Sequence, residues 1–354
     1  MRRNSDSSLR GAQWQSHGAP QQGQFGASMI YRVAGLRNVP ECIAPVPAKG
    51  WWKRGPRMSV LNETRRRYAE EIRAESKIRS AALVEAFARV PREHFLGPGP
   101  WKVVRPEAGG DQGYQNTEAA PAQLYQNVLV AIDAARGLNN GLPSSLALWL
   151  DALDLLPGDR VYHVGCGVGY YTAIIAEVVL PRAPDGPPGH VVAIEIDAQL
   201  AARARENLAG YAGVEVHQGD GATFDPGECD VIFVNAGATR PQPLWLDRLS
   251  ARGRLLVPLT VTQSGAPEGG GMLKVWRQGA GYAARFVSMV YIFPCLGSRD
   301  EEHNRRLQKA FARSNSAAVR SLRRDPHTEN ETCWLHGADF CISMAAPPEP
   351  VAAR

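Results

Sequence analysis

Three glycines in alternate positions constrain the fold of this chain most strongly. Gly165, Gly167 and Gly169 directly follow the apolar run 161–164 and precede a second apolar segment at 170–180. This order predicts a buried strand, a tight loop and a helix. Glycine allows a ligand to approach the backbone closely, and the free N–H groups at the start of a helix face such a ligand. The sequence therefore predicts a ligand-binding loop between a strand and a helix.

Strands and helices alternate around this loop, as they do in a doubly wound α/β fold. The expected strands are 161–164, 191–195, 214–217, 230–234, 254–258, 272–276 and 284–291, and the expected helices are 170–180, 198–208 and 243–249. We expect a Rossmann-like α/β domain whose sheet is mostly parallel and has helices on both faces.

Polar residues follow three of these strands where each strand ends. Glu195 ends the second strand, Asp220 and Gly221 follow the third, and Asn235 ends the fourth. The carboxyl ends of neighbouring parallel strands meet at one edge of a sheet, where α/β folds bind ligands. We expect Glu195 to bind ribose hydroxyls and Asp220 to accept a hydrogen bond from an adenine amino group. Gly221 would leave room for the adenine ring, and Asn235 completes the predicted cofactor site.

The glycine spacing helps to choose the cofactor. Dinucleotide sites carry G-x-G-x-x-G, whose third glycine packs the helix close to the diphosphate. This chain has G-x-G-x-G followed by the aromatic Tyr170, which suits a cofactor without phosphates. S-adenosylmethionine is therefore the predicted cofactor, and a nucleotide-linked oxidoreductase is the disfavoured alternative.

Charge and composition exclude other classes of function. The formal net charge is +5, but residues 1–57 contain nine basic and two acidic residues, so the rest of the chain carries about −2. The folded part therefore lacks the basic surface of a nucleic-acid-binding protein. No apolar run approaches the roughly 18 residues that a membrane-spanning helix needs. Six scattered cysteines form no disulfide pattern, which predicts a reducing, cytoplasmic environment.

The chain divides into four predicted segments. Residues 1–57 are expected to be a disordered basic extension, and 58–150 a helical region that includes the loop 139–145. Residues 151–295 are expected to form the cofactor-binding domain, and 296–354 a C-terminal extension. That extension contains H-x5-C-x2-H-x4-C from His327 to Cys341, a possible ligand set for structural zinc. Because the spacing matches no common zinc finger, we expect a packed segment without a metal.

Several segments resemble the protein-L-isoaspartate O-methyltransferase family over roughly residues 65–295. The matching segments are Val-Pro-Arg-Glu-x-Phe at 90–95, the glycine loop with its aromatic at 161–170, Gly-Asp-Gly at 219–221, a helix and Gly-Arg-Leu strand at 243–258, and Arg-Phe-Val at 285–287. The resemblance implies a divergent member of the family with N- and C-terminal extensions. It implies an S-adenosylmethionine-dependent methyltransferase fold and transfer of a methyl group to a carboxylate on a protein or peptide. The three loop glycines would then hold the methionine part of the cofactor.

The chain differs from this family near the expected methyl acceptor. The family has a Gly-Gln-Thr-Ile-Ser-x-Pro loop, and here Asn139 replaces the Thr and Gly141 replaces the Ser. We expect Asn139 and Ser144, from the loop 139–145, to serve the acceptor. His163 replaces an acid of the first cofactor motif; it is either a hydrogen-bond partner of the cofactor or a packed strand histidine.

These differences leave two alternatives to isoaspartyl methylation. One is a methyltransferase of the same fold with a small-molecule or peptide-natural-product acceptor. The other is a cofactor-binding protein without turnover. The sequence predicts no oligomeric state.

Overall fold

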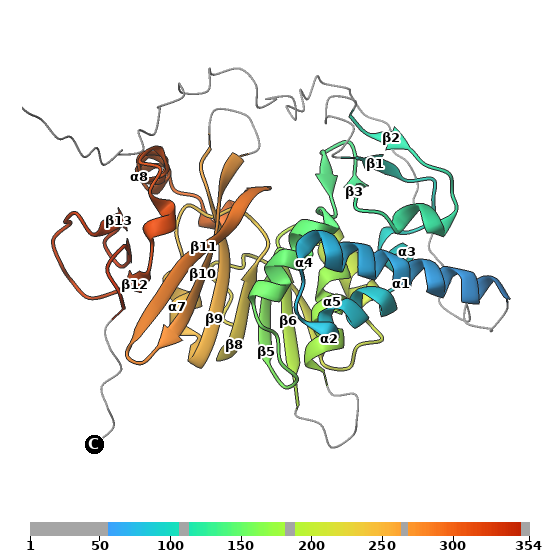
Figure 1. Cartoon of the computed structure of the whole chain (residues 1–354), viewed down its shortest axis with the longest axis horizontal. Coiled ribbons are helices and arrows are strands. Elements are labelled where there is room, and N and C mark those ends of the chain that lie inside the picture. The colour runs from blue at the N-terminus through green and yellow to red at the C-terminus, as the bar shows by residue number, and fades with distance from the viewer. Residues whose placement is uncertain (1–55, 106–112, 181–187, 263–267, 348–354) are drawn as a thin grey trace, which may run out of the picture.

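A ten-stranded mixed sheet forms the centre of the computed structural model, which describes residues 56–105, 113–180, 188–262 and 268–347 (Figure 1). The strand order is β13-β14-β12-β11-β10-β9-β8-β5-β6-β7. The strands are β5 (Arg160–Val164), β6 (His190–Glu195), β7 (Val214–Gln218), β8 (Cys229–Val234), β9 (Leu249–Thr260), β10 (Glu268–Gln278), β11 (Gly281–Ile292), β12 (Ser321–Arg323), β13 (Cys333–His336) and β14 (Cys341–Ser343).

Strands β9, β8, β5, β6 and β7 pair in parallel, whereas every other neighbouring pair in this sheet is antiparallel. The prediction of a mostly parallel sheet is therefore wrong for the sheet as a whole. Two features cause the difference: β10 and β11 form a long hairpin, and strands of the C-terminal extension continue the sheet beyond β11. The α/β class and the parallel half that carries the glycine loop are as predicted.

Helices cover both faces of the sheet. They are α1 (Pro56–Ser76), α2 (Ala81–Arg89), α3 (Arg92–Leu96), α4 (Pro143–Ala152), α5 (Tyr170–Val179), α6 (Ala198–Asn207), α7 (Pro243–Asp247) and α8 (Glu301–Ala312), with short 3-10 turns η2 (Pro121–Leu124), η3 (Leu296–Ser298) and η4 (Ser316–Ala318). Successive strand residues such as Val161 and Tyr162 belong to two different apolar clusters, because alternate side chains of a strand point to opposite faces. Helices α1, α2, α4, α5 and α6 contribute to the first cluster, and α7 and α8 to the second. None of the described helices is long and apolar enough to cross a membrane.

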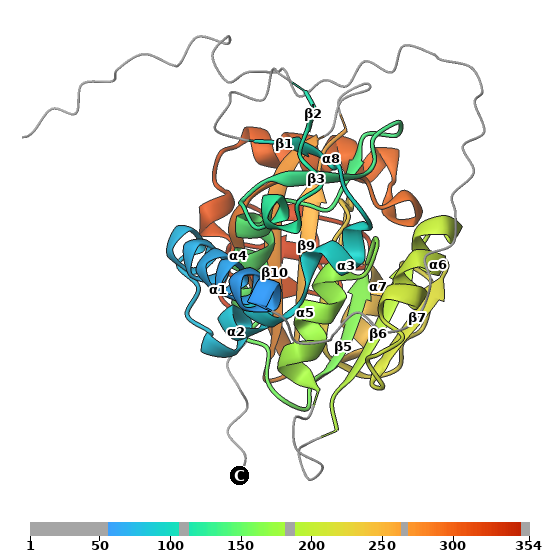
Figure 2. The same cartoon turned by 90° about the vertical axis from the view of Figure 1, so that its right-hand side faces the viewer.

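The segment predicted to be helical, 58–150, also contains a small four-stranded sheet. Its strands are β1 (Lys102–Val104), β2 (Gln115–Asn116), β3 (Leu129–Asp133) and β4 (Leu138–Asn139), in the order β2-β1-β3-β4. The small sheet lies at the top of the molecule in both views (Figures 1 and 2). Strand β4 carries Asn139 and leads directly into α4, so the small sheet positions the loop expected to cover the acceptor.

The C-terminal extension packs onto the same core as strands β9 and β10. Leu307 of α8 and Trp334 of β13 lie in the second apolar cluster together with β9 and β10. Residues 1–55 of the predicted basic extension and 348–354 of the C-terminal extension lie outside the described residues.

Arg92, in the Val-Pro-Arg-Glu-x-Phe segment, is fully buried. Its guanidinium donates hydrogen bonds to the carbonyls of Leu124 at 2.6 Å, Gln126 at 3.1 Å and Val128 at 3.0 Å. It also lies 5.9 Å from the ring centroid of Tyr170, the first residue of α5, within range of a cation–π contact. Arg92 therefore joins α3, the segment 124–128 and the helix that follows the glycine loop.

We predict that Arg92→Met lowers the free energy of unfolding by about 3–5 kcal/mol. The substitution leaves three carbonyls without their donor, and hydrogen bonds to a charged group contribute about 1.5–3 kcal/mol each. Urea unfolding measures the effect. The control is Arg89→Met at the exposed end of α2, whose ion pair with Glu85 is a surface pair that contributes below about 1 kcal/mol. A loss below 1 kcal/mol for Arg92→Met would show that the buried guanidinium does not hold this region together.

Candidate functional site

The glycine loop joins β5 to α5, and its three glycines adopt positive φ angles of 75°, 57° and 90°. A Cβ on Gly169 would lie 2.8 Å from Leu208, and a Cβ on Gly165 would lie 3.2 Å from the carbonyl oxygen of Asn235. These two glycines therefore allow close packing within the protein. A Cβ on Gly167 would meet only Ile132, at 4.0 Å. Gly167 is thus the position where the loop backbone faces open space.

Glu195 connects the end of β6 to this loop. The residue is 8% exposed, and its carboxylate accepts hydrogen bonds from the Gly167 N–H at 2.9 Å and from the Asp197 N–H at 3.1 Å. Each carboxylate oxygen has further lone pairs, which can accept from a ligand hydroxyl. Glu195 thus lies directly beside the open position of the loop.

Asn235 and Asp220 lie at the same edge of the sheet. The Asn235 N–H donates to the Val164 carbonyl at 2.8 Å, and the N–H of Gly219 donates to the Glu195 carbonyl at 2.9 Å. The side-chain amide of Asn235 donates to the Gly165 carbonyl at 3.4 Å. The structure therefore brings the predicted cofactor residues from four strand ends together.

Asp220 follows β7, and its carboxylate accepts a hydrogen bond from the Ala222 N–H at 2.8 Å. A Cβ on Gly221 would lie 2.4 Å from Val164, so close packing against β5 requires this glycine. Packing within the protein thus accounts for Gly221, and its expected role in leaving room for an adenine ring stays a prediction.

Gly297 of η3 lies against the Asp220 carboxylate. A Cβ on Gly297 would lie 2.0 Å from one of the Asp220 oxygens. The first turn of the C-terminal extension therefore packs onto the predicted adenine-binding acid. The sequence did not predict this contact, because Gly297 lies 77 positions after Asp220 and belongs to no motif of the cofactor site.

His163 is fully buried in β5. Its Nδ1 shares a hydrogen bond with the Thr172 hydroxyl at 2.9 Å, and its ring stacks on Phe233 with 5.1 Å between centroids. Burial lowers the pKa of His163 to about 3, so the ring is neutral at pH 7. This geometry favours the packed strand histidine of the two alternatives, and a role in cofactor binding stays a prediction.

Asn139 and Ser144 lie on the two sides of Gly141, which has a φ of 74°. The Asn139 side-chain oxygen accepts from the Gly141 N–H at 2.9 Å, which leaves the amide NH₂ as the group that can donate to a ligand. The Ser144 hydroxyl accepts from the Asn127 amide at 2.9 Å, and Asn127 in turn accepts from the Ser144 N–H at 3.0 Å. Asn127 therefore caps the start of α4, and Ser144 belongs to that cap.

Asn140 is a polar residue that sequence reasoning passed over. Its side-chain NH₂ is buried and has no hydrogen-bond partner within the part of the chain that the structure describes. A buried, unpaired amide is unfavourable in a folded protein, which makes Asn140 a candidate ligand-binding group. The sequence does contain a signal that could have identified Asn140, because this polar residue stands where the family loop has an apolar Ile.

The chemistry of this edge is that of a binding site without a nucleophile. Its described residues offer carboxylates, side-chain amides and backbone N–H groups, together with the thiols of Cys166 and Cys295. Burial raises the pKa of Cys166 far above its usual range and that of Cys295 to about 12, so both thiols stay protonated at pH 7. Such an arrangement can bind and orient two molecules, and the reacting groups must come from them.

His163 leads to a prediction on acid stability. Its pKa is about 3 in the folded chain and about 6.5 in the unfolded chain, so the unfolded chain binds this proton first. Stability is therefore full above pH 6.5 and falls as the pH decreases. We expect His163 to lower the free energy of unfolding by about 2 kcal/mol between pH 7.5 and 5. The variant His163→Gln should lack this part of the pH dependence.

Urea midpoints measured across this pH range test the prediction. His190→Gln, at a half-exposed position, should keep the pH dependence of the wild-type protein. An unchanged pH dependence in His163→Gln would contradict the assignment.

Comparison with known proteins matches this chain to one family. The family model described as protein-L-isoaspartate(D-aspartate) O-methyltransferase matches residues 63–268, more than half of the chain. Protein-L-isoaspartate O-methyltransferase 2 of Archaeoglobus fulgidus is 34% identical over 203 residues, which cover 56% of this chain and 79% of that protein. The protein-L-isoaspartate O-methyltransferase of Hyperthermus butylicus is 35% identical over 206 residues, which cover 56% of this chain and 76% of that protein.

A solved structure shows the same fold. A protein-L-isoaspartate O-methyltransferase superposes with a TM-score of 0.53 at 20% identity, covering 73% of this chain and 72% of that one. The resemblance inferred from the sequence motifs is thereby confirmed, and the chain belongs to the protein-L-isoaspartate(D-aspartate) O-methyltransferase family.

Proposed function

We propose that this protein transfers the methyl group of S-adenosylmethionine to the carboxylate of an isoaspartyl residue in a protein or peptide. The observation that carries the proposal is the contact between the Glu195 carboxylate and the Gly167 N–H. It sets an acid with free acceptor positions beside the one loop glycine that faces open space. This is the arrangement that an adenosyl group with an attached amino acid requires at the edge of an α/β sheet.

The residues present fit S-adenosylmethionine, the cofactor of this family. Glu195 offers acceptors for the two ribose hydroxyls, and Asp220 offers an acceptor for the adenine amino group. The loop from Gly165 to Gly169 offers backbone N–H groups and open space for the methionine part. Asn235 fixes the loop through the Gly165 carbonyl.

Methyl transfer requires little more from the protein than the alignment of the cofactor with the acceptor carboxylate. The bound cofactor supplies a methyl group on a positively charged sulfur, which is already activated for displacement. An acceptor carboxylate is ionised near neutral pH and needs no general base, in keeping with a site that has no nucleophile. The NH₂ of Asn139 would donate to one carboxylate oxygen and leave the other free to attack. Holding both partners in line supplies most of the rate enhancement.

Ser144 acts on this site as a positioning residue. Its hydroxyl is engaged by Asn127, and that pair fixes the start of α4 and hence the loop that carries Asn139. We therefore place Asn139 at the acceptor and Ser144 behind it.

The residues of the loop 139–145 also support a second class of methyl acceptor. Asn139 and Asn140 put two amides where the family has Thr and Ile, and the NH₂ of Asn140 is buried without a partner. Such a pair of donors would also suit a carboxylate on a small molecule or a peptide natural product. A protein that binds the cofactor without turnover is the third possibility, which the assay below separates.

The proposal includes a cytoplasmic location. The six cysteines are scattered along the sequence without a disulfide pattern, which fits a reducing compartment.

An isoaspartyl peptide and its normal aspartyl twin provide the direct assay. We expect the full chain to methylate the isoaspartyl peptide only, measured as labelled methyl ester. Asn139→Ala should lower kcat/KM by about tenfold, the effect of one hydrogen bond to a charged group, and Asn139→Thr should retain more activity. Equal methylation of both peptides, or of neither while the cofactor product binds, would overturn the isoaspartyl assignment.

Glu195→Ala tests the cofactor site separately. Loss of hydrogen bonds between a charged carboxylate and the ribose should weaken binding by about 1–3 kcal/mol, or roughly five- to 150-fold. Calorimetric titration with S-adenosylhomocysteine measures the affinity. The matched control is Glu206→Ala, at an exposed position of α6, which should bind as the wild-type protein does. An unchanged affinity in Glu195→Ala would remove Glu195 from the site.

A further inference from the structure

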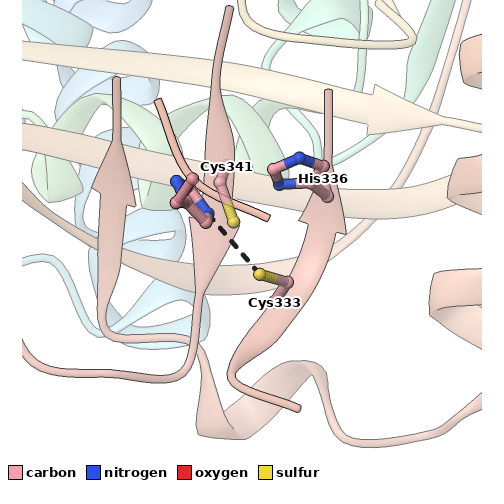
Figure 3. Close-up of side chains that lie close together, drawn as sticks. Cys333, His336 and Cys341 are labelled. Atoms are coloured by element: carbon pink, nitrogen blue, oxygen red, sulfur yellow. Dashed lines mark hydrogen bonds between the residues drawn. The ribbon is translucent and has the colours of Figure 1, made fainter. Parts of the chain in front are cut away.

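Four metal-ligating side chains of the C-terminal extension converge at one place. His327, Cys333, His336 and Cys341 each present one nitrogen or sulfur atom, and these four atoms all lie within 4.8 Å of one another. Figure 3 shows the side chains of Cys333, His336 and Cys341 turned toward a common centre. We propose that this cluster is a structural zinc site, a function separate from the methyltransferase reaction.

The strand register explains how the residues meet. Strands β13 and β14 are antiparallel, with His336 opposite Cys341 and Cys333 opposite Ser343. The pairing shifts between Cys333 and Leu335, and such an irregularity re-aims side chains along a strand. Leu335 and Ile342 belong to the apolar core. The two short strands thus have one face in the core and the ligand pair His336 and Cys341 on the other.

His327 comes from the connection between β12 and β13. Its Nε2 lies 3.6 Å from the Cys333 sulfur. Tetrahedral zinc with bonds of about 2.3 Å to sulfur and 2.0–2.1 Å to nitrogen requires ligand atoms about 3.3–3.8 Å apart. The His327–Cys333 pair already has this separation. The widest separation in the cluster, 4.8 Å, exceeds it by about 1 Å, which small side-chain rotations close.

The second ring nitrogen of His327 makes a hydrogen bond of the kind that is usual for metal-ligating histidines. Nδ1 donates to the backbone carbonyl of Asp325 at 2.8 Å. This bond places the ring proton on Nδ1 and leaves the lone pair of Nε2 directed at the cluster.

His336 adds an independent observation. Its Nδ1 is buried and makes no hydrogen bond to any residue that the structure describes. A buried ring nitrogen without a partner is unfavourable, and packing alone gives no reason to keep a histidine here. A cation bound between the two imidazoles would give this histidine a role.

The chemistry of the four ligands selects the metal. Two thiolates neutralise a divalent cation, and two sulfurs with two imidazole nitrogens are typical of tetrahedral zinc. No carboxylate belongs to the set, which disfavours calcium and magnesium.

A cross-link would stabilise the short strands of the extension. Strands β12, β13 and β14 contain three, four and three residues, and short strands are only marginally stable alone. Trp334 anchors β13 by edge contacts with Phe286 and Phe311, at 5.0 and 5.1 Å between centroids. A bound metal would fix His327 and both strands to each other, and metal binding of this kind contributes directly to folding.

The experiment uses the full chain and two metals as probes. After chelation and removal of the chelator, Zn²⁺ should bind at one ion per chain. Co²⁺ should give the strong visible bands of a tetrahedral ion and a thiolate charge-transfer band in the near ultraviolet. The double variant Cys333→Ser/Cys341→Ser should lose both signals. Cys229→Ser, which removes a buried thiol from β8, is the matched control and should retain them.

The outcomes decide the proposal without reference to methyl transfer. Zinc at one ion per chain, tetrahedral cobalt, and a melting temperature that chelation lowers in the wild-type protein and leaves unchanged in the double variant would all support the site. Absence of bound zinc, an octahedral cobalt spectrum, or a disulfide between Cys333 and Cys341 would overturn it. The wild-type cobalt spectrum alone decides the matter if the double variant does not fold.

Discussion

The hydrogen bonds of the buried Arg92 guanidinium connect the two halves of the candidate site. They hold the segment 124–128 against α3, and the same side chain contacts Tyr170 at the start of α5. From that segment Asn127 reaches the first turn of α4 and fixes Ser144. The loop expected to cover the acceptor and the helix expected to face the cofactor therefore share one buried anchor. The Val-Pro-Arg-Glu-x-Phe segment thus supports the site through the contacts of Arg92.

The cofactor edge depends on glycines that serve different purposes. Gly165 and Gly169 are required by contacts within the protein, whereas Gly167 leaves open space. Glu195 binds the N–H of this one glycine, which couples the shape of the loop to the end of the neighbouring strand. A second contact ties the site to the C-terminal extension, because Gly297 lies against Asp220. The extension is thus part of the wall of the site as well as of the distant end of the sheet.

The parallel half of the sheet was predictable because its signals are local. Apolar runs, glycine turns and the acid at each strand end recur in order, and β5 through β8 lie within one or two residues of their expected bounds. The far half was not predictable in the same way. That β12 pairs with β11, with Leu322 opposite Tyr282, depends on contacts between residues 40 positions apart in the chain.

The site likewise combines features that local sequence signals predict with features that depend on tertiary contacts. That Glu195, Asp220 and Asn235 lie together could be predicted from their places at strand ends, and their roles toward the cofactor stay predictions. The spacing could not reveal that Asn127 caps α4, that Gly297 contacts Asp220, or that Gly221 packs against Val164, because each depends on tertiary packing. His163 stood between two interpretations, and its burial against Phe233 is a property that only the assembled core defines.

A crystal structure of the full chain with S-adenosylhomocysteine would test the cofactor site directly. We predict that the ribose hydroxyls lie within hydrogen-bond distance of the Glu195 carboxylate, the adenine amino group at Asp220, and the amino-acid part over Gly167. A ligand bound elsewhere, or a Glu195 side chain turned away from the ribose, would contradict it.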